Sequence, residues 1–202
     1  SFRDETSLDL SATKMKEFES SVVTIGGEKI LPVAAVYGAN ASGKSNVYSA
    51  FEFMTAYVGN SFFYGDDDKT FADARPTPFL FDSRARNAES LFEVYFTIPG
   101  ENAEKTYNYG FCIDETGITE EWLNTKAKSA REFKSVFYRN TEKQELDLRG
   151  IAKVSRDNIE VALNRQVLII SLGAKLKVEK CKQIRDWFLL NEFADFGNEM
   201  TN

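Results

Sequence analysis

The feature that most constrains this chain is the glycine-rich stretch from Gly38 to Ser45, which reads Gly-Ala-Asn-Ala-Ser-Gly-Lys-Ser. It fits the pattern G-x-x-x-x-G-K-S/T, in which the glycines let the backbone curl tightly without a Cβ clash. The amide groups of such a loop point inward and form an anion cradle, and the following helix adds its positive N-terminal end. The stretch therefore predicts a phosphate-binding loop between a strand and a helix.

The residues on either side of the loop match this prediction. Lys29 to Tyr37 is an almost uninterrupted apolar run, which is typical of a strand buried on both faces in a parallel sheet. Thr6 to Leu10 alternates like a strand, and Gly26-Gly27 is a hairpin turn signal. Residues 43 to 58 carry one apolar stripe at helical spacing and end at Gly59-Asn60.

The motif assigns a role to each part of the loop. Lys44 is expected to reach the β- and γ-phosphates of a nucleoside triphosphate, and the Ser45 hydroxyl to coordinate Mg²⁺. The backbone amides of the remaining positions are expected to surround the phosphates. The predicted cofactors are ATP and Mg²⁺, and the predicted site comprises Gly38, Ala39, Asn40, Ala41, Ser42, Gly43, Lys44, Ser45 and Asn46.

The rest of the chain predicts further layers. Residues 61 to 78 suggest a surface loop, and 89 to 148 suggest antiparallel strands with aromatic residues at period two. From about Asn158 the pattern is helical, with Leu176, Ile184, Trp187 and Phe188 on one face. The expected fold is α/β: a partial P-loop NTPase core (1–60), an antiparallel β-subdomain (61–150) and a helical C-terminal stretch (151–202).

Composition excludes several classes of function. The net charge of −6 argues against a broad nucleic-acid-binding face on these residues. The absence of histidine removes Ser-His and Cys-His catalysis, and two isolated cysteines make neither a zinc site nor a disulfide framework. No apolar run approaches the roughly 20 residues of a membrane span, and no signal peptide opens the chain. We therefore expect a cytoplasmic protein without a membrane partner.

Residues 38 to 46 resemble the Walker A motif of ABC-type ATPases in the SMC, RecF and OLD-nuclease group. More narrowly, they are similar to bacterial AAA family ATPases linked to abortive infection and phage defence. In that family, Asn at the third loop position, Ser at the fifth and Asn after the hydroxyl residue are typical. Further segments that resemble the family are Ser1-Phe2-Arg3, Pro78 to Asp82 followed by Phe92 to Phe96, Tyr107 to Phe111, and Glu120 to Leu123.

The resemblance implies a head that binds ATP between two copies, so that the full-length protein acts as a homodimeric ATPase. Hydrolysis in such heads needs a Walker B strand ending in Asp-Glu and a signature loop from the partner. Val167 to Ile170 is apolar, but Ser171 and Leu172 follow it, and no Leu-Ser-x-Gly sequence occurs. We therefore expect an N-terminal part of one head, with the remainder beyond Asn202, that hydrolyses negligible ATP alone.

Several interpretations stay open at this stage. Glu121 is a candidate for the family's magnesium-proximal glutamine-loop position, against an ordinary exposed strand residue. A non-hydrolysing nucleotide-sensing module is the main alternative function; a GTPase switch lacks its Asn-Lys-x-Asp motif. The further partners considered are an effector protein and nucleic acid. Other features with both a functional and a structural interpretation are Asp66 to Asp68 (metal), Arg75, Arg84 and Arg86 (phosphate), Tyr107, Tyr109 and Phe111 (base stacking), and Trp187-Phe188 (docking).

Overall fold

The computed structural model describes residues 2, 4–12, 19–25, 28–40, 42–66, 68–77, 88–100 and 105–191. Its largest element is a five-stranded antiparallel sheet in which each strand pairs with the next one along the chain. This sheet confirms the antiparallel strands predicted between residues 89 and 148. Its members are β3 (Ser90–Thr97), β4 (Lys105–Asp114), β5 (Gly117–Ala127), β6 (Lys134–Asn140) and β7 (Glu145–Asp147).

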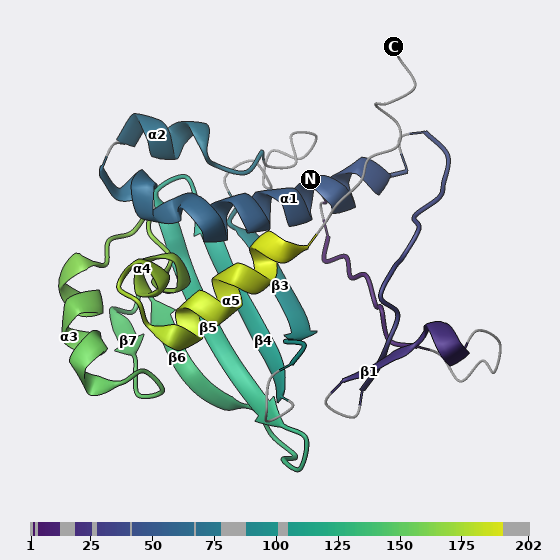
Figure 1. Ribbon diagram of the computed structural model, residues 1–202. Helices are drawn as coiled ribbons and strands as arrows, with labels where there is room; N and C mark the ends of the chain where they lie inside the picture. Colours follow the sequence, from purple (N-terminus) through teal and green to yellow (C-terminus); the bar gives the residue numbers. More distant parts are fainter. Residues whose placement is uncertain are drawn as a thin grey trace.

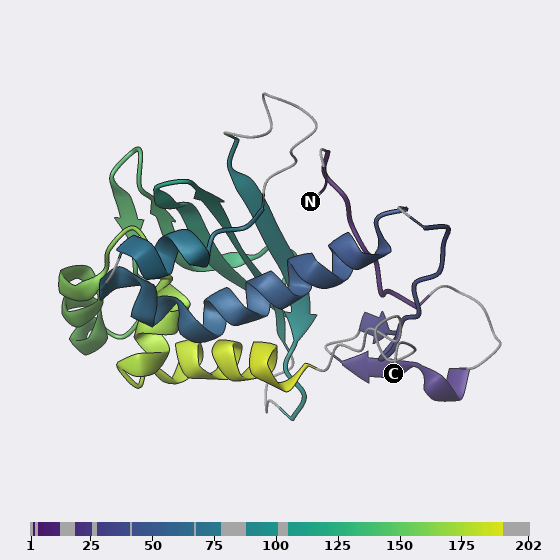
Figure 2. The same ribbon diagram turned by 90° about the horizontal axis from the view of Figure 1, so that it is seen from above.

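The helices cover one face of this sheet (Figure 1). α1 (Lys44–Asn60) and α5 (Glu179–Leu190) lie across the strands, and α4 (Ile169–Lys175) contacts both of them. Figure 2 shows α1 and α5 as one layer beside the sheet. α3 (Lys153–Ala162) contacts α4 and begins five residues before the predicted start of the helical region at Asn158. Among the helices of the described ranges, none is both long and apolar enough to cross a bilayer.

Aromatic rings fill the space between the sheet and the helices. Tyr57 of α1 stacks on Phe111 of β4, with ring centroids 5.7 Å apart. Trp187 of α5 stacks on Phe96 of β3 at 4.0 Å, and Phe188 meets Tyr109 edge to face at 5.8 Å. Burial of such large side chains removes much apolar surface from water. Trp187 and Phe188 therefore pack internally, which is one of the two interpretations that the sequence left open.

A small second sheet lies near the start of the chain. It consists of β1 (Val23–Ile25) and β2 (Glu28–Ile30), paired antiparallel, with an isolated bridge from Ser11 to Ile30. The 3-10 helix η1 (Glu19–Ser21) precedes it. The hairpin expected here is confirmed, while its turn at Gly26-Gly27 lies outside the described residues.

The buried parallel strand predicted from Lys29 to Tyr37 is not observed. β2 ends at Ile30, and residues 31 to 38 are extended or irregular and exposed. Val33 is 80% exposed and Tyr37 is 89% exposed. Only Lys29 and Ile30 of the run lie in a strand, and they pair antiparallel with β1. A strand needs a neighbour for its backbone hydrogen bonds, and residues 31 to 38 pair with no strand of the described ranges. The strand predicted from Thr6 to Leu10 is also absent.

The surface loop predicted from residue 61 to 78 is wrong over most of its length. Ser61–Asp66 forms the 3-10 helix η2, and Asp68–Asp73 forms α2. η2 continues directly from α1, because Ser61 and Phe62 hydrogen-bond with the α4 region and hold the chain in a helical path. The mixed α/β class is thus confirmed, with more helix than the sequence suggested.

Candidate functional site

The glycine-rich loop joins the extended residues 33 to 38 to the first turn of α1 (Figure 1). Gly43 is the N-cap of α1, and its carbonyl accepts hydrogen bonds from the amides of Asn46 at 3.0 Å and Val47 at 3.2 Å. The amides of Lys44 and Ser45 precede the first intrahelical hydrogen bond, so they have no acceptor within the helix. The loop and the helix start therefore expose amide donors at one point. Ala41 of the predicted site lies outside the described residues.

The two glycines of the motif lie at crowded positions. Gly43 has a φ of 91°, in the left-handed region that favours glycine. A Cβ at Gly43 would lie 3.1 Å from the ring of Phe2, and a Cβ at Gly38 would lie 2.7 Å from the Ser42 hydroxyl oxygen, which would have to turn away. The backbone conformation therefore favours glycine at position 43, and Gly38 allows the close approach of Ser42.

The Lys44 side chain reaches back over the start of the loop. Its ammonium donates hydrogen bonds to the carbonyls of Gly38 at 2.8 Å and Ala39 at 2.7 Å. An ammonium group has three donors, so one remains for a ligand. Ser42 also closes the turn, donating its amide to the Ala39 carbonyl at 3.2 Å. This places a positive charge beside the exposed amides.

A shallow pocket of about 150 Å³ lies at the start of α1 and is lined by Ser42, Gly43, Lys44, Ser45 and Asn46. The Ser45 side chain is exposed, so its hydroxyl oxygen is available to a hard cation bound with phosphate. Ala39 and Asn40 lie at the exposed outer turn of the loop. Of the described residues of the predicted site, Ser42 to Asn46 line this pocket, and Gly38 and Ala39 accept hydrogen bonds from Lys44. Asn40 neither lines the pocket nor accepts from Lys44.

The sheet positions this pocket through the opposite end of α1. The buried residues of the helix are Met54, Tyr57 and Val58, all in its C-terminal half. The Tyr57 hydroxyl donates to the Gln166 carbonyl at 2.7 Å, and the Ser61 hydroxyl accepts from the Leu168 amide at 3.1 Å. These contacts fix the axis of α1 and therefore the direction in which its N-terminus points.

Glu121 is neither an exposed strand residue nor part of the loop site. It is fully buried, and its carboxylate accepts from Arg139 at 3.1 Å and Tyr109 at 3.2 Å. It also accepts from the amides of Ile169 at 2.8 Å and Ile170 at 3.3 Å, at the start of α4. Burial raises the pKa of the Glu121 carboxyl, and the Arg139 charge opposes that shift. The four donors give Glu121 a structural role that joins β5 to α4 and corrects the expectation of an exposed side chain.

Other sequence candidates have structural explanations. Tyr107, Tyr109 and Phe111 are fully buried under the helices, so base stacking on this stripe is wrong. Val167 to Ile170 leads into the buried helix α4 rather than forming a strand. Arg75 donates to the Glu115 carbonyl at 3.2 Å, whereas Arg84 and Arg86 lie outside the described residues.

Neither a metal cluster nor a reactive thiol is present in the described part of the chain. No group of three or more acidic or thiol side chains there could hold a metal ion, and Asp67 of the acidic run lies outside it. Both cysteines are free and buried. Burial raises the pKa of each thiol, Cys112 and Cys181, to about 12. Both cysteines are therefore free thiols of the protein interior.

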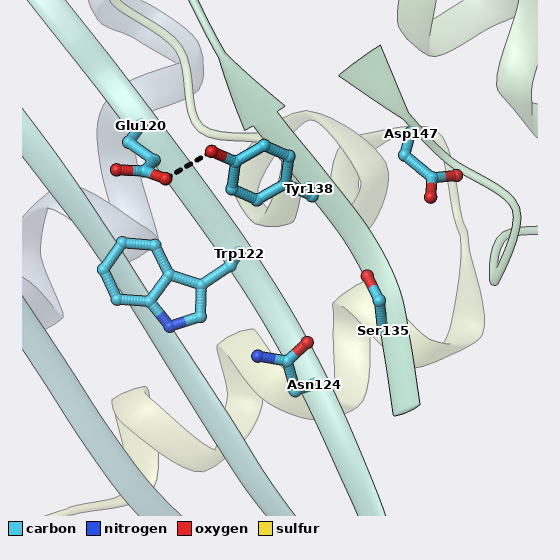
Figure 3. Close-up of a pocket in the computed structure, with 6 residues that line it drawn as sticks. All are labelled: Glu120, Trp122, Asn124, Ser135, Tyr138 and Asp147. Atoms are coloured by element: carbon cyan, nitrogen blue, oxygen red, sulfur yellow. Dashed lines mark hydrogen bonds between the residues drawn. The ribbon is translucent and has the colours of Figure 1, made fainter. Parts of the chain in front are cut away.

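A second pocket, on the face of the sheet that no described helix covers, was not predicted from the sequence. It has a volume of about 530 Å³ and is lined by Glu120, Trp122, Asn124, Ser135, Tyr138 and Asp147 (Figure 3). The available signal was the period-two alternation of Glu120, Trp122 and Asn124, which places three polar or amphipathic side chains on one face of β5.

Comparison with known proteins agrees with the geometry of the loop. Residues 33–169, more than half of the chain, match a family model described as "AAA domain, putative AbiEii toxin, Type IV TA system". No curated protein and no solved structure matches the chain. The match includes the whole glycine-rich loop, α1 and the sheet up to the start of α4. The chain therefore belongs to this AAA-domain family of P-loop NTPases, whose membership implies nucleotide binding.

Proposed function

We propose that the loop from Gly38 to Ser45 binds the triphosphate of ATP and that the chain is part of an ABC-type ATPase head. The observation that carries the proposal is the placement of the Lys44 ammonium, 2.8 Å from the Gly38 carbonyl and 2.7 Å from the Ala39 carbonyl, beside the amides that begin α1. A cation, free amide donors and a helix N-terminus together favour a multiply charged anion. The family membership, which implies nucleotide binding, supports a nucleotide phosphate as that anion.

In this proposal each group of the pocket has one task. The amides of Lys44 and Ser45 at the start of α1 bind phosphate oxygens, and the third donor of Lys44 binds between the β- and γ-phosphates. The Ser45 hydroxyl and phosphate oxygens supply ligands to Mg²⁺, which neutralises charge on the triphosphate. Asn46 lines the same pocket one residue further along α1 and completes the predicted site.

The finer assignment rests on the resemblance of residues 38 to 46 to SMC, RecF and OLD-like heads. Heads of that kind bind ATP between two copies, so we propose a homodimer of the full-length, cytoplasmic protein. Its ATP-driven association would act on an effector or on nucleic acid, in phage defence or DNA handling. The toxin–antitoxin wording of the family description supports a defence role.

The alternative is a nucleotide-sensing module that binds ATP without turnover. It is favoured by one observation, which is that the apolar stretch Val167 to Ile170 continues as helix α4 and carries no acidic pair. Binding alone does not distinguish the two functions. Phosphate release measured on the full-length protein does, because the sensing module predicts none.

The test of nucleotide binding is a thermal-shift titration of wild-type protein and Lys44→Ala with ATP and Mg²⁺. At a ligand concentration about 100 times Kd, binding to the native state stabilises the wild type by roughly 2.7 kcal/mol. Loss of the charged donor is expected to weaken binding by about 1.5–3 kcal/mol.

Lys153→Ala is the matched control, because Lys153 is the first residue of helix α3 as Lys44 is of α1, and its side chain is exposed. It should retain the wild-type shift with ATP. Equal ATP-induced shifts in wild type, Lys44→Ala and Lys153→Ala would contradict the proposed site.

A further inference from the structure

The sheet face opposite the described helices carries a pocket that the nucleotide site does not use. Along β5, Glu121 and Leu123 point to the helices, so Glu120, Trp122 and Asn124 point the other way. Tyr138 and Ser135 of β6 and Asp147 of β7 complete the pocket (Figure 3). In Figure 3 the helices lie behind the strands and the six side chains stand in front.

Trp122 provides an aromatic platform in this pocket. A Cβ at Gly110 would lie 2.3 Å from Trp122 Cζ2, so the indole lies directly on the β4 backbone where glycine leaves room for it. The indole nitrogen donates to Glu93 Oε1 at 3.3 Å, which fixes the orientation of the ring. One face of the indole is thus covered by the sheet, and the other borders the pocket.

A chain of hydrogen bonds makes Asn124 an acceptor toward the pocket. Glu93 Oε1 accepts from Asn108 Nδ2 at 2.7 Å, which turns the Asn108 oxygen toward Asn124. Asn124 Nδ2 then donates to that oxygen at 2.9 Å. The Glu93 carboxylate, which begins this series of hydrogen bonds, has only acceptors, so the orientation of the Asn108 and Asn124 amides follows from it. Figure 3 shows the Asn124 oxygen on the side of Ser135.

The charges of the pocket have one predominant sign. Tyr138 donates its hydroxyl to Glu120 Oε1, which leaves Oε2 for a ligand. Asp147 is paired with Arg149 at 2.7 Å, whereas no ion pair within the described ranges involves Glu93 or Glu120. The pocket therefore combines a carboxylate, an amide oxygen and an indole face, all of which attract a donor-rich cation.

We propose that this pocket binds the guanidinium group of an arginine side chain from a partner protein. A guanidinium is planar and stacks on an indole. Its N–H donors lie in the plane of the guanidinium group, where Glu120 and Asn124 can accept hydrogen bonds from them. Phosphate of a nucleic acid would be repelled by Glu93 and Glu120. A second copy of this face, paired about a two-fold axis, would bring the same carboxylates together.

The chain contains two tryptophans, and they report on opposite faces of the sheet. In a ¹H–¹⁵N spectrum, the Trp122 indole signal reports on the pocket. The Trp187 indole, stacked on Phe96 under the helices, serves as an internal control. The probe is an acetylated and amidated peptide Gly-Arg-Gly-Arg-Gly, titrated into the ¹⁵N-labelled protein. The Trp122 signal should shift saturably, and the Trp187 signal should stay in place.

Three further probes separate the sources of the effect. The same peptide with citrulline in place of arginine has the same shape without the charge and should not bind. The lysine peptide should bind more weakly, because an ammonium neither stacks nor donates in a plane. Free arginine at equal guanidinium concentration should bind more weakly than the peptide if the site recognises a protein segment.

Two variants place the interaction in the pocket. Glu120→Gln keeps an acceptor for Tyr138 but removes the charge, and it should weaken binding of the arginine peptide about tenfold. Trp122→Leu should weaken it about three- to tenfold through loss of the cation–π contact. Glu52→Gln, an exposed acidic residue of α1 on the covered side of the sheet, is the control and should bind as wild type does.

The proposal is overturned by any of three results. These are equal binding of the citrulline and arginine peptides, absence of a Trp122 shift at millimolar peptide, or an unchanged Kd in Glu120→Gln. If Trp122→Leu fails to fold, the Glu120→Gln titration decides, because that substitution preserves the size of the side chain and an acceptor for the Tyr138 hydroxyl.

Discussion

At the scale of single residues, the structure separates two acidic neighbours by the face of β5 on which each one lies. Glu120 borders an open pocket, whereas Glu121 is fully buried and accepts four hydrogen bonds. The sequence places both on a strand but does not show which face is covered. Two of its donors come from the neighbouring strands β4 and β6 and two from the start of α4, so its role depends on strand register and on helix packing and could not be predicted from the sequence.

Replacement of Glu121 by Gln should destabilise the protein by about 3–5 kcal/mol. The substitution leaves the buried Arg139 guanidinium without a counter-charge, and breaking one side of a buried pair has this cost. Denaturant unfolding of wild type and Glu121→Gln measures the difference. Glu120→Gln on the same strand is the control, with an expected change below about 1 kcal/mol. A similarly small change in Glu121→Gln would contradict the structural role of the ion pair.

Replacement of Ser45 by Ala should reduce the part of ATP affinity that depends on Mg²⁺. In the proposed function the hydroxyl contacts the ion, whereas Lys44 and the backbone amides would contact phosphate directly. Titrations of ATP with Mg²⁺ and with EDTA, on wild type and Ser45→Ala, separate the two parts. If the substitution lowers both affinities by the same factor, Ser45 acts on phosphate or on folding rather than on the metal.

At the scale of elements, the sequence predicted the helix and the strands whose pattern lies within a short stretch of consecutive residues. The helix after the loop and the five antiparallel strands follow from residue spacing and turn residues, and both are observed. The strand from Lys29 to Tyr37 was not predicted correctly, because a strand exists only with a neighbour and its apolar composition does not supply one. η2 and α2 were missed because Ser61 and Ser171 hold this region through contacts more than 100 positions apart in sequence.

The loop itself was the most predictable site, because each of its requirements lies within eight consecutive residues. The glycine positions, the helix N-terminus and the back-folded Lys44 are all local properties of the motif. The pocket on the open sheet face combines side chains from β5, β6 and β7, so it depends on strand register. Register is set across the sheet, and the sequence pattern of one strand does not reveal it.

The entry into α1 gives a prediction at this scale. Gly43→Ala should destabilise the protein by about 1–3 kcal/mol because of the positive φ, and it should also remove stabilisation by ATP. Gly100→Ala is a matched control: Gly100 has a φ of 77°, but a Cβ there meets nothing within 4 Å. Thermal melts with and without ATP compare the two. Gly100→Ala should keep the full ATP shift, and retention of that shift by Gly43→Ala would argue against a tight loop around phosphate.

At the scale of the whole molecule, a single antiparallel sheet separates two surfaces with different chemistry. One side carries the helices and the glycine-rich loop, and the other carries the acidic and aromatic pocket (Figures 1 and 3). The loop belongs to the helix side because α1 packs on Phe111 and contacts α5. A ligand on one surface therefore does not occupy the other, and the two proposed sites can be tested independently.

The protein of 202 residues should hydrolyse ATP negligibly by itself. In the proposed function Lys44 and the loop amides bind the triphosphate in its ground state, and such uniform binding would not accelerate phosphoryl transfer. In the described ranges no cluster of acidic side chains accompanies Ser45 to hold metal and orient water. A phosphate-release assay with Lys44→Ala as background measures this. Turnover of about 10 s⁻¹ that disappeared in Lys44→Ala would mean that all the groups needed for hydrolysis lie within these residues.

The burial of both thiols has a consequence for the chemical lifetime of the protein. Cys112 lies on a central strand and Cys181 packs against Gly173, and the pKa of each thiol is raised to about 12. At neutral pH very little of either thiol is then a thiolate, which is the species that oxidants and alkylating agents attack. Oxidative damage must wait for the fold to open. In the presence of excess reagent, the rate at which free thiol is lost therefore reports the rate at which the fold opens. Loss of free thiol during storage then depends on the conformational stability of the protein.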